Sequence, residues 1–139
     1  MLACRDPADS EGVPARERVL GYMAGTYDPR EALPPRVVLV AVIGDVVVGY
    51  AAGHLTRRHG CDGEVEWLYV GPPHRRRGIA TALLEALARW FGDHSARTVC
   101  VNVLPTNSPA IAMYQTRGAR VLNEHWLLWG DVRTVAATA

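Results

Sequence analysis

Two runs of apolar, largely β-branched residues set the strongest constraint on the fold of this chain. The segment VVLVAVIGDVVVGYAAGHL, residues 37–55, is divided by Gly44-Asp45. A short turn-forming pair between two strand-forming runs is typical of a tight antiparallel hairpin. Both strands carry few polar residues, so we expect both to be largely buried. The chain should therefore be organised around a β-sheet.

A strand and a helix are predicted directly after this hairpin. The segment EVEWLYVG, residues 64–71, alternates in the manner of a strand. Strict alternation would place Glu64, Glu66, Leu68 and Val70 on one face and Val65, Trp67 and Tyr69 on the other. Apolar residues then recur at helical spacing from Ile79 to Phe91, and Gly92 provides a stop.

The remainder of the chain repeats this order, whereas residues 1–36, before the hairpin, show a weaker pattern. RTVCVNVL, residues 97–104, is a further strand, and Asn107-Ser108-Pro109 is typical of a capped helix start, with Gly118 at the helix end. Residues 119–132 provide one or two final strands, and we expect the tail 133–139 to fray. Within residues 1–36 the pattern favours a helix from Arg16 to Met23. The order predicts an α/β domain with a parallel pair in a mixed sheet.

Length and composition exclude several functions. A chain of 139 residues fits one domain, residues 1–139, and its formal net charge of +1 argues against non-specific binding to nucleic acids or anionic membranes. All 15 basic residues are arginine, so lysine Schiff-base chemistry and a lysine-containing nucleotide loop are both excluded. The three cysteines are far apart and form no C-x-x-C pair, which predicts neither a disulfide framework nor a metal site and favours a reduced, cytoplasmic protein.

Positive charge is concentrated in front of the predicted helix at residues 79–91. GPPHRRRGIAT, residues 71–81, brings three arginines and a glycine to a helix start, where the macrodipole is already positive. Unpaired backbone N–H groups at such a start bind phosphate, and arginine adds charge and bidentate hydrogen bonds. A pyrophosphate would relieve the crowding of positive charge. The alternative is an ordinary solvated turn.

Two segments at matching positions resemble one family. Arg75-Arg76-Arg77-Gly78-Ile79-Ala80 matches the R/Q-x-x-G-x-G/A signature of the GNAT superfamily of acetyl-CoA-dependent N-acetyltransferases, between a strand and an amphipathic helix. The later segment VNVLPTNSPAIAMYQTRGA, residues 101–119, is similar to the family's N-x-x-A-x-x-x-Y-x-x-x-G helix. The resemblance covers residues 37–131. Two departures are an opening strand that would begin almost at Met1, and Ala119 in place of the usual aromatic residue.

The resemblance implies a fold and a co-substrate site. The expected fold is a mixed, mostly antiparallel sheet of six to seven strands, flanked by helices, whose fourth and fifth strands form a splayed parallel pair. Acetyl-CoA would lie in the gap with its pantetheine arm bonded to strand backbone, and its diphosphate would lie on the turn. The residues implied in this binding are Leu68, Tyr69, Val70, Arg75, Arg76, Arg77, Gly78, Ile79, Ala80, Thr81, Asn107 and Ala110.

The resemblance also implies catalytic roles for an acid and a base. Tyr114 matches the tyrosine that protonates or hydrogen-bonds the CoA sulfur, although a tyrosine packed on an amphipathic helix is the alternative. Glu66 or Glu64 would accept the proton of the amine, and we favour Glu66 because it lies closer to the splay. His54 and His125 are reserve candidates for this base.

These implications predict an N-acetyltransferase that acts on a primary amine by direct attack in a ternary complex. A CoA-binding sensor or interaction module without efficient turnover is the alternative, and nucleic-acid binding through the arginine run ranks third. The acceptor could be a small molecule, a peptide N-terminus or a protein lysine. The chain could form a homodimer, as family members often do.

Overall fold

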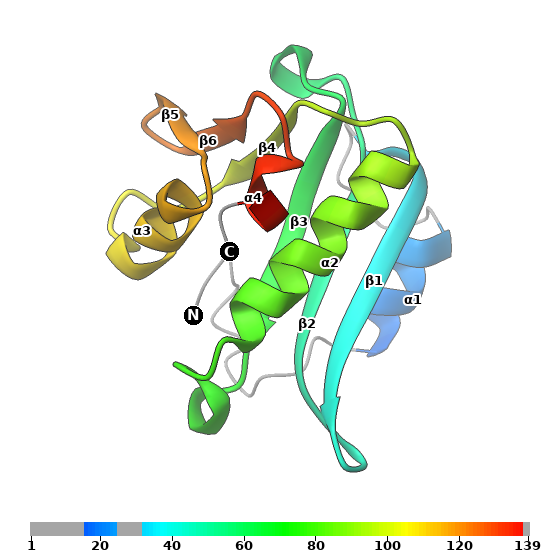
Figure 1. The fold of residues 1–139 in the computed structure, drawn as a ribbon. Helices are drawn as coiled ribbons and strands as arrows, with labels where there is room; N and C mark the ends of the chain where they lie inside the picture. Colours follow the sequence, from blue (N-terminus) through cyan, green and yellow to red (C-terminus); the bar gives the residue numbers. More distant parts are fainter. Residues whose placement is uncertain (1–15, 25–31, 138–139) are drawn as a thin grey trace.

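The computed structural model describes residues 16–24 and 32–137, and within them a six-stranded sheet has the order β1-β2-β3-β4-β6-β5 (Figure 1). The strands are β1 Leu33–Ile43, β2 Val46–Leu55, β3 Gly63–Val70, β4 Val99–Asn102, β5 Arg120–Asn123 and β6 Trp126–Trp129. The helices are α1 Arg16–Ala24, α2 Ile79–Asp93, α3 Ser108–Thr116 and α4 Thr134–Ala137, and two short 3₁₀ turns are η2 Arg58–Gly60 and η3 Pro72–His74. The opening strand expected near Met1 lies outside the described residues.

The predicted hairpin is confirmed as β1 and β2, which pair antiparallel around Gly44. Gly44 has φ +60°, a left-handed conformation that glycine adopts without strain. The expectation that both strands are buried is right for β2 and wrong for β1. Among the described strands β1 forms the edge of the sheet, so it has a strand partner on one side and many of its side chains are exposed.

The predicted parallel pair is β3 and β4, and it is short. Pairing covers Gly63–Val65 of β3 against Val99–Val101 of β4. Strand β3 continues to Val70 beside β2, whereas no β4 residue pairs with it beyond Val65. The two strands therefore separate after three residue pairs, which confirms the expected splay.

Helices cover the two faces of the sheet differently. Helix α2 lies across the strands on one face, and α1 lies on the other (Figure 1). Leu84, Leu87 and Phe91 of α2 are fully buried against the sheet, as the helical apolar spacing predicted. The approach is close, because a Cβ added to Gly63 would lie 2.6 Å from Cε1 of Phe91. This contact anchors the start of β3 firmly against α2.

The predicted face assignment along β3 is right as far as Glu66 and wrong from Trp67 onward, because β3 contains a β-bulge. Gly53 of β2 pairs with Val65, and Ala52 pairs with Trp67, so Glu66 is the extra residue. A bulge resets the alternation of side chains. Leu68 and Val70 consequently share the α2 face with Val65, whereas Glu64, Glu66, Trp67 and Tyr69 lie on the α1 face.

The end of the chain is more ordered than its sequence suggests. Thr134–Ala137 forms the short helix α4, and Val135 is fully buried in the main core. The expectation of a frayed tail is therefore wrong as far as residue 137, because burial of Val132 and Val135 holds this segment in place. The stretch 119–132 supplies two strands, β5 and β6. None of the helices among the described residues is both long enough and apolar enough to cross a membrane.

Candidate active site

A cavity of about 430 Å³ lies between the start of α2 and the start of α3. It is lined by Val70, His74, Arg75, Arg76, Gly78, Ile79, Ala80, Thr81, Asn107, Pro109 and Met113. Most of the residues predicted to bind the co-substrate are among them. Leu68, Tyr69, Arg77 and Ala110, which were predicted with them, do not line this cavity.

Backbone conformation opens the start of α2 towards the cavity. Gly78 is the N-cap residue with φ +80°, and Arg76 also has a positive φ of +64°. The first helical hydrogen bond runs from the Ala82 N–H to the Gly78 carbonyl, so the amides of Ile79–Thr81 precede the helical ladder. The first turn carries no acidic residue and Gly78 provides no side-chain cap. The positive end of the helix is therefore available to an anion.

The three arginines of this turn have different environments. Nε of Arg75 donates to the Val70 carbonyl at 2.8 Å, and its guanidinium lies 5.5 Å from the centre of the Tyr69 ring. Arg75 therefore ties the turn to the end of β3. Arg76 and Arg77 are exposed, and of these two Arg76 borders the cavity. Charge for an anion thus comes mainly from Arg76, whereas Arg75 fixes the shape of the turn.

Asn107 and Tyr114 lie on the other side of the gap. Oδ1 of Asn107 accepts a hydrogen bond from the Ala110 amide at 3.3 Å, which is the helix cap that the sequence predicted. Tyr114 is fully buried, and its ring meets Trp129 edge-on with centroids 5.6 Å apart. It belongs to the same buried cluster as Leu68. Met113, its neighbour in the chain, lines the cavity. The hydroxyl of Tyr114 is buried along with its ring, and the chemical role of Tyr114 stays a prediction.

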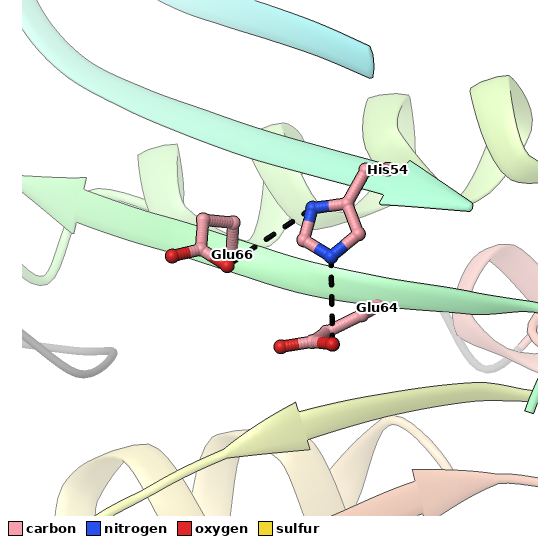
Figure 2. Close-up of side chains that lie close together, drawn as sticks. All are labelled: His54, Glu64 and Glu66. Carbon is pink, nitrogen blue, oxygen red and sulfur yellow. Dashed lines mark ion pairs between the residues drawn. The ribbon is translucent and has the colours of Figure 1, made fainter. Parts of the chain in front are cut away.

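On the opposite face of the sheet, two predicted base candidates, Glu64 and Glu66, lie on either side of a third, the imidazole of His54 (Figure 2). Nε2 of His54 lies 3.4 Å from Oε1 of Glu64, and Nδ1 lies 4.0 Å from Oε1 of Glu66. His54 comes from β2, and both glutamates come from β3. The fourth candidate, His125, lies elsewhere: its side chain is 51% exposed and pairs with Glu124 at 3.2 Å.

Two further residues complete this cluster, and the sequence analysis missed both. The hydroxyl of Tyr22 on α1 lies 2.6 Å from the Gly53 carbonyl and 2.8 Å from Nδ1 of His54. Nε of Arg58 donates to Oε1 of Glu64 at 2.9 Å. Tyr22 is more than 30 residues from its partners, and no local pattern connects them. We refer to Tyr22, His54, Arg58, Glu64 and Glu66 as the His54 cluster.

The two carboxylates of the His54 cluster differ in their electrostatics. Burial first, and then the nearby charge of Glu64, raise the pKa of Glu66 to about 8, against opposing effects from Arg58 and Arg36. Glu64 has its own cationic partner in Arg58. Burial also raises the pKa of Tyr22 well above its usual range, so its hydroxyl stays protonated. Glu66 is therefore the group whose proton affinity suits acid–base chemistry near neutral pH.

The same three side chains could in principle ligate a metal ion. A single ion can bind only one nitrogen of an imidazole, yet the two carboxylates lie beside different nitrogens (Figure 2). Arg58 also brings a positive charge to Glu64, which disfavours a second cation there. The arrangement suits a proton better than a metal ion.

A splayed parallel strand pair with an anion-ready helix start beside it defines the fold as that of a GNAT-type acetyltransferase. A model of the acetyltransferase (GNAT) family matches residues 9–119. The chain belongs to this family, which confirms the resemblance of its motifs.

Individual relatives match over part of their length. The chain is 27% identical over 85 residues to an aminoglycoside N(6')-acetyltransferase type 1 of Salmonella typhimurium, covering 57% of this chain and 59% of that protein. It is 44% identical over 81 residues to mycothiol acetyltransferase of Parafrankia, covering 52% of this chain and 23% of that protein. The matches thus span between about a quarter and three-fifths of these relatives.

The fold also matches solved structures. Naa20 of Chaetomium thermophilum, in complex with a bisubstrate analogue, superposes with a TM-score of 0.68 at 21% identity, over 93% of this chain and 80% of that one. At this level of identity the likeness concerns the fold.

Proposed function

We propose that the chain is an N-acetyltransferase that moves the acetyl group of acetyl-CoA to a primary amine by direct attack in a ternary complex. One observation carries the proposal. The part of β3 that pairs with β2 but not with β4 starts after Val65 and leads into the turn whose helix amides open onto the cavity of about 430 Å³. A base, a strand edge that β4 does not cover and an anion cradle therefore follow one another along 16 residues, 66–81.

The co-substrate would occupy this route from end to end. Its diphosphate would accept hydrogen bonds from the amides of Ile79–Thr81, with charge from Arg76. The amides of its pantetheine arm would pair with the backbone of Leu68–Val70, which has no β4 partner. Asn107 would border the arm from the α3 side. These assignments agree with the roles that the family resemblance implies.

The reaction requires movement of two protons. The amine nitrogen attacks the thioester carbonyl, the C–N bond forms and the C–S bond breaks. An ammonium ion must lose one proton before it attacks, and Glu66 would take that proton. The second leaves the nitrogen for solvent as the amide forms, while the departing thiolate gains a proton either from solvent or from Tyr114, which solvent then reprotonates. The products are the acetylated amine and CoA thiol, with net release of one proton.

The position of the two groups supports this division of roles. Glu66 lies on the α1 face of the sheet, and Tyr114 belongs to the core on the α2 face. The two groups thus lie on opposite faces of the sheet, so an acyl group between β3 and β4 would have the base on one face and the acid on the other. Glu66 is preferred to Glu64 because its side chain is 17% exposed, against 5% for Glu64, and because Glu64 bonds directly to the cation of Arg58.

A thiol-release assay with acetyl-CoA and a panel of amines tests the proposal. The panel covers aminoglycosides, polyamines, peptide N-termini and protein lysines. For an accepted amine, Glu66→Gln and Tyr114→Phe should each lower kcat at least tenfold. Glu124→Gln, at a side chain that is 78% exposed, and Tyr50→Phe, a buried tyrosine of the α1 face, are the matched controls and should leave kcat unchanged. Equal rates for the Glu66 variant and its control would rule out Glu66 as the base.

The competing function is a CoA-binding sensor or interaction module. It would show CoA binding by calorimetry without thiol release on any member of the panel. The elevated pKa of Glu66 favours the enzyme, because a buried carboxylate that titrates near neutrality costs stability and has no evident use in a binding module.

Two further expectations accompany this proposal. We place the activity in the cytoplasm, which agrees with Cys61 and Cys100 being free thiols. We also expect a homodimer, which light scattering on the purified chain would detect as twice the mass of 15.2 kDa.

A further inference from the structure

The hydrogen positions around His54 follow from the partners of Tyr22. A carbonyl oxygen can only accept a hydrogen bond, so the contact of 2.6 Å between the Tyr22 hydroxyl and the Gly53 carbonyl uses the single hydroxyl hydrogen. The same hydroxyl lies 2.8 Å from Nδ1 of His54. Since its hydrogen is already committed, the hydroxyl oxygen must accept from Nδ1. Nδ1 of His54 therefore carries a proton.

The other ring nitrogen lies against a carboxylate. Nε2 of His54 lies 3.4 Å from Oε1 of Glu64, which is an ion-pair distance and not a hydrogen bond; it makes no hydrogen bond to a described residue and belongs to a side chain that is 0% exposed. In a neutral ring with its proton on Nδ1, the lone pair of Nε2 would face the negative oxygen in a site closed to water. That arrangement is repulsive. A second proton on Nε2 converts it into an attractive ion pair.

Arg58 decides which partner holds this second proton. Its Nε donates to the same Oε1 of Glu64 at 2.9 Å, and a cation at that distance favours the ionised carboxylate. The proton consequently belongs to His54 rather than to Glu64. The buried ring then carries a proton on both nitrogens, as an imidazolium does.

We propose that His54 is a positioning residue held as an imidazolium by Tyr22 and by the Glu64–Arg58 pair, and that its buried charge keeps the neighbouring Glu66 carboxylate ionised. This inference rests on the proposed function only where it assigns Glu66 as the base. The charge would lie 4.0 Å from Oε1 of Glu66, on the side away from Glu64 (Figure 2). At this separation an opposite charge lowers the pKa of a carboxyl group by about one to three units.

A positive charge on His54 would oppose the effects that raise the pKa of Glu66. Burial and the charge of Glu64 raise its pKa to about 8, which would leave only a minor ionised fraction at pH 7 to act as a base. Among the described residues, the groups that face it are Glu64 on its own strand, His54 on β2, Tyr22 on α1, Arg36 on β1 and Arg58 in η2. Arg36 and Arg58 already favour the ionised form, and an imidazolium at 4.0 Å adds a third positive charge.

The first test observes the protons directly. Nitrogen-15 NMR of the full chain, with the His54 signals assigned by their loss in His54→Asn, should show both ring nitrogens protonated at pH 7. A spectrum with one protonated and one bare nitrogen would overturn the proposal. This readout requires neither co-substrate nor acceptor, so it is independent of the proposed activity.

The second test measures the effect on Glu66. In uniformly carbon-13 labelled protein, the carboxyl signal of Glu66 is titrated in the wild type, in His54→Asn and in His54→Gln. Asn retains a donor near the Nδ1 position and Gln retains one near Nε2, but both are uncharged. Both should raise the pKa of Glu66 by at least one unit, a tenfold change in its proton affinity. His94→Gln, at an exposed histidine at the end of α2, is the control and should not change it.

Activity provides a third readout that separates the two proposals. In an active system, His54→Asn should move the acid limb of the pH profile of kcat/KM to higher pH, by as many pH units as the pKa of Glu66 rises. Activity should recover at high pH, and KM for acetyl-CoA should not change. If the Glu66 signal shifts but Glu66→Gln remains active, the proposed base is wrong and the role of His54 stands. If the Glu66 titration is the same in all variants, the role of His54 is refuted even in an active enzyme.

Discussion

Gly78→Ala separates the cost of backbone strain from the loss of an anion cradle. Gly78 has φ +80°, and a Cβ built there meets no protein atom within 4 Å. An alanine would therefore encounter no steric clash within the protein itself, and its cost is conformational, about 1–2 kcal/mol for a left-handed residue. Gly44 in the β1–β2 turn has φ +60° and is equally open, so Gly44→Ala is a matched control. We expect both variants to lose about the same free energy of unfolding.

Binding should distinguish the two variants. If the turn relaxes away from its left-handed conformation, amides of Ile79–Thr81 lose their alignment, and a hydrogen bond to a charged group is worth about 1.5–3 kcal/mol. If the turn holds, the new methyl group occupies the open space that a phosphate would use. Either response should weaken CoA binding to Gly78→Ala by about ten- to hundredfold, whereas Gly44→Ala should bind CoA as the wild type does.

Two measurements decide the outcome. Urea unfolding gives the stability of each variant, and isothermal titration with CoA gives its Kd. An unchanged Kd for Gly78→Ala, at a stability loss equal to that of Gly44→Ala, would refute the assignment of this helix start as the diphosphate site.

Three other predictions concern stability. Glu66→Gln should be more stable than the wild type by an amount that grows as the pH rises from 4.5 towards 8, because a raised folded-state pKa makes the wild type lose stability over that window, by at most about 1.4 kcal/mol per pH unit. This gain should be larger in a His54→Asn background, and urea unfolding at pH 5 and 8 measures it. Gly63→Ala should cost about 1–3 kcal/mol in the same assay, because the new Cβ would lie 2.6 Å from Phe91. Hydrogen bonds from the Arg97 and Thr98 amides lower the pKa of Asp62, so Asp62→Asn should destabilise at pH 7 and this difference should shrink as the pH falls below 4, which a comparison of melting temperatures would show.

Local chemistry in the sequence was sufficient to predict the elements that form the cavity. Gly44-Asp45 marks the hairpin, Asn107-Ser108-Pro109 marks the start of α3, and the Arg75–Gly78 segment marks the start of α2. In each case residues within one turn determine the conformation, so a short stretch of sequence is sufficient to predict it. The individual roles of the arginines were not predictable, because the bond from Arg75 to the Val70 carbonyl depends on how the turn folds back.

The His54 cluster depends on contacts that a linear reading does not reveal. The bulge at Glu66 exists only in the register between β2 and β3, and nothing in EVEWLYVG distinguishes it from a regular strand. The meeting of Tyr22 with His54 depends on how α1 packs against the sheet. Both glutamates were predicted as candidates from residue type and position, whereas the imidazole between them was only a reserve candidate.

A single backbone irregularity accounts for much of the candidate active site. The bulge begins directly after Val65, which is also the last residue of β3 that pairs with β4. Bulges increase local twist and bend the strand that contains them, so the same feature that places Trp67 on the α1 face beside Glu66 also directs the remainder of β3 away from β4. The placement of Leu68 and Val70 on the α2 face and the gap beside β4 thus have one structural origin. Any change that restored regular pairing of Ala52 and Gly53 with β3 would close the gap and return Leu68 and Val70 to the face of Glu66 together.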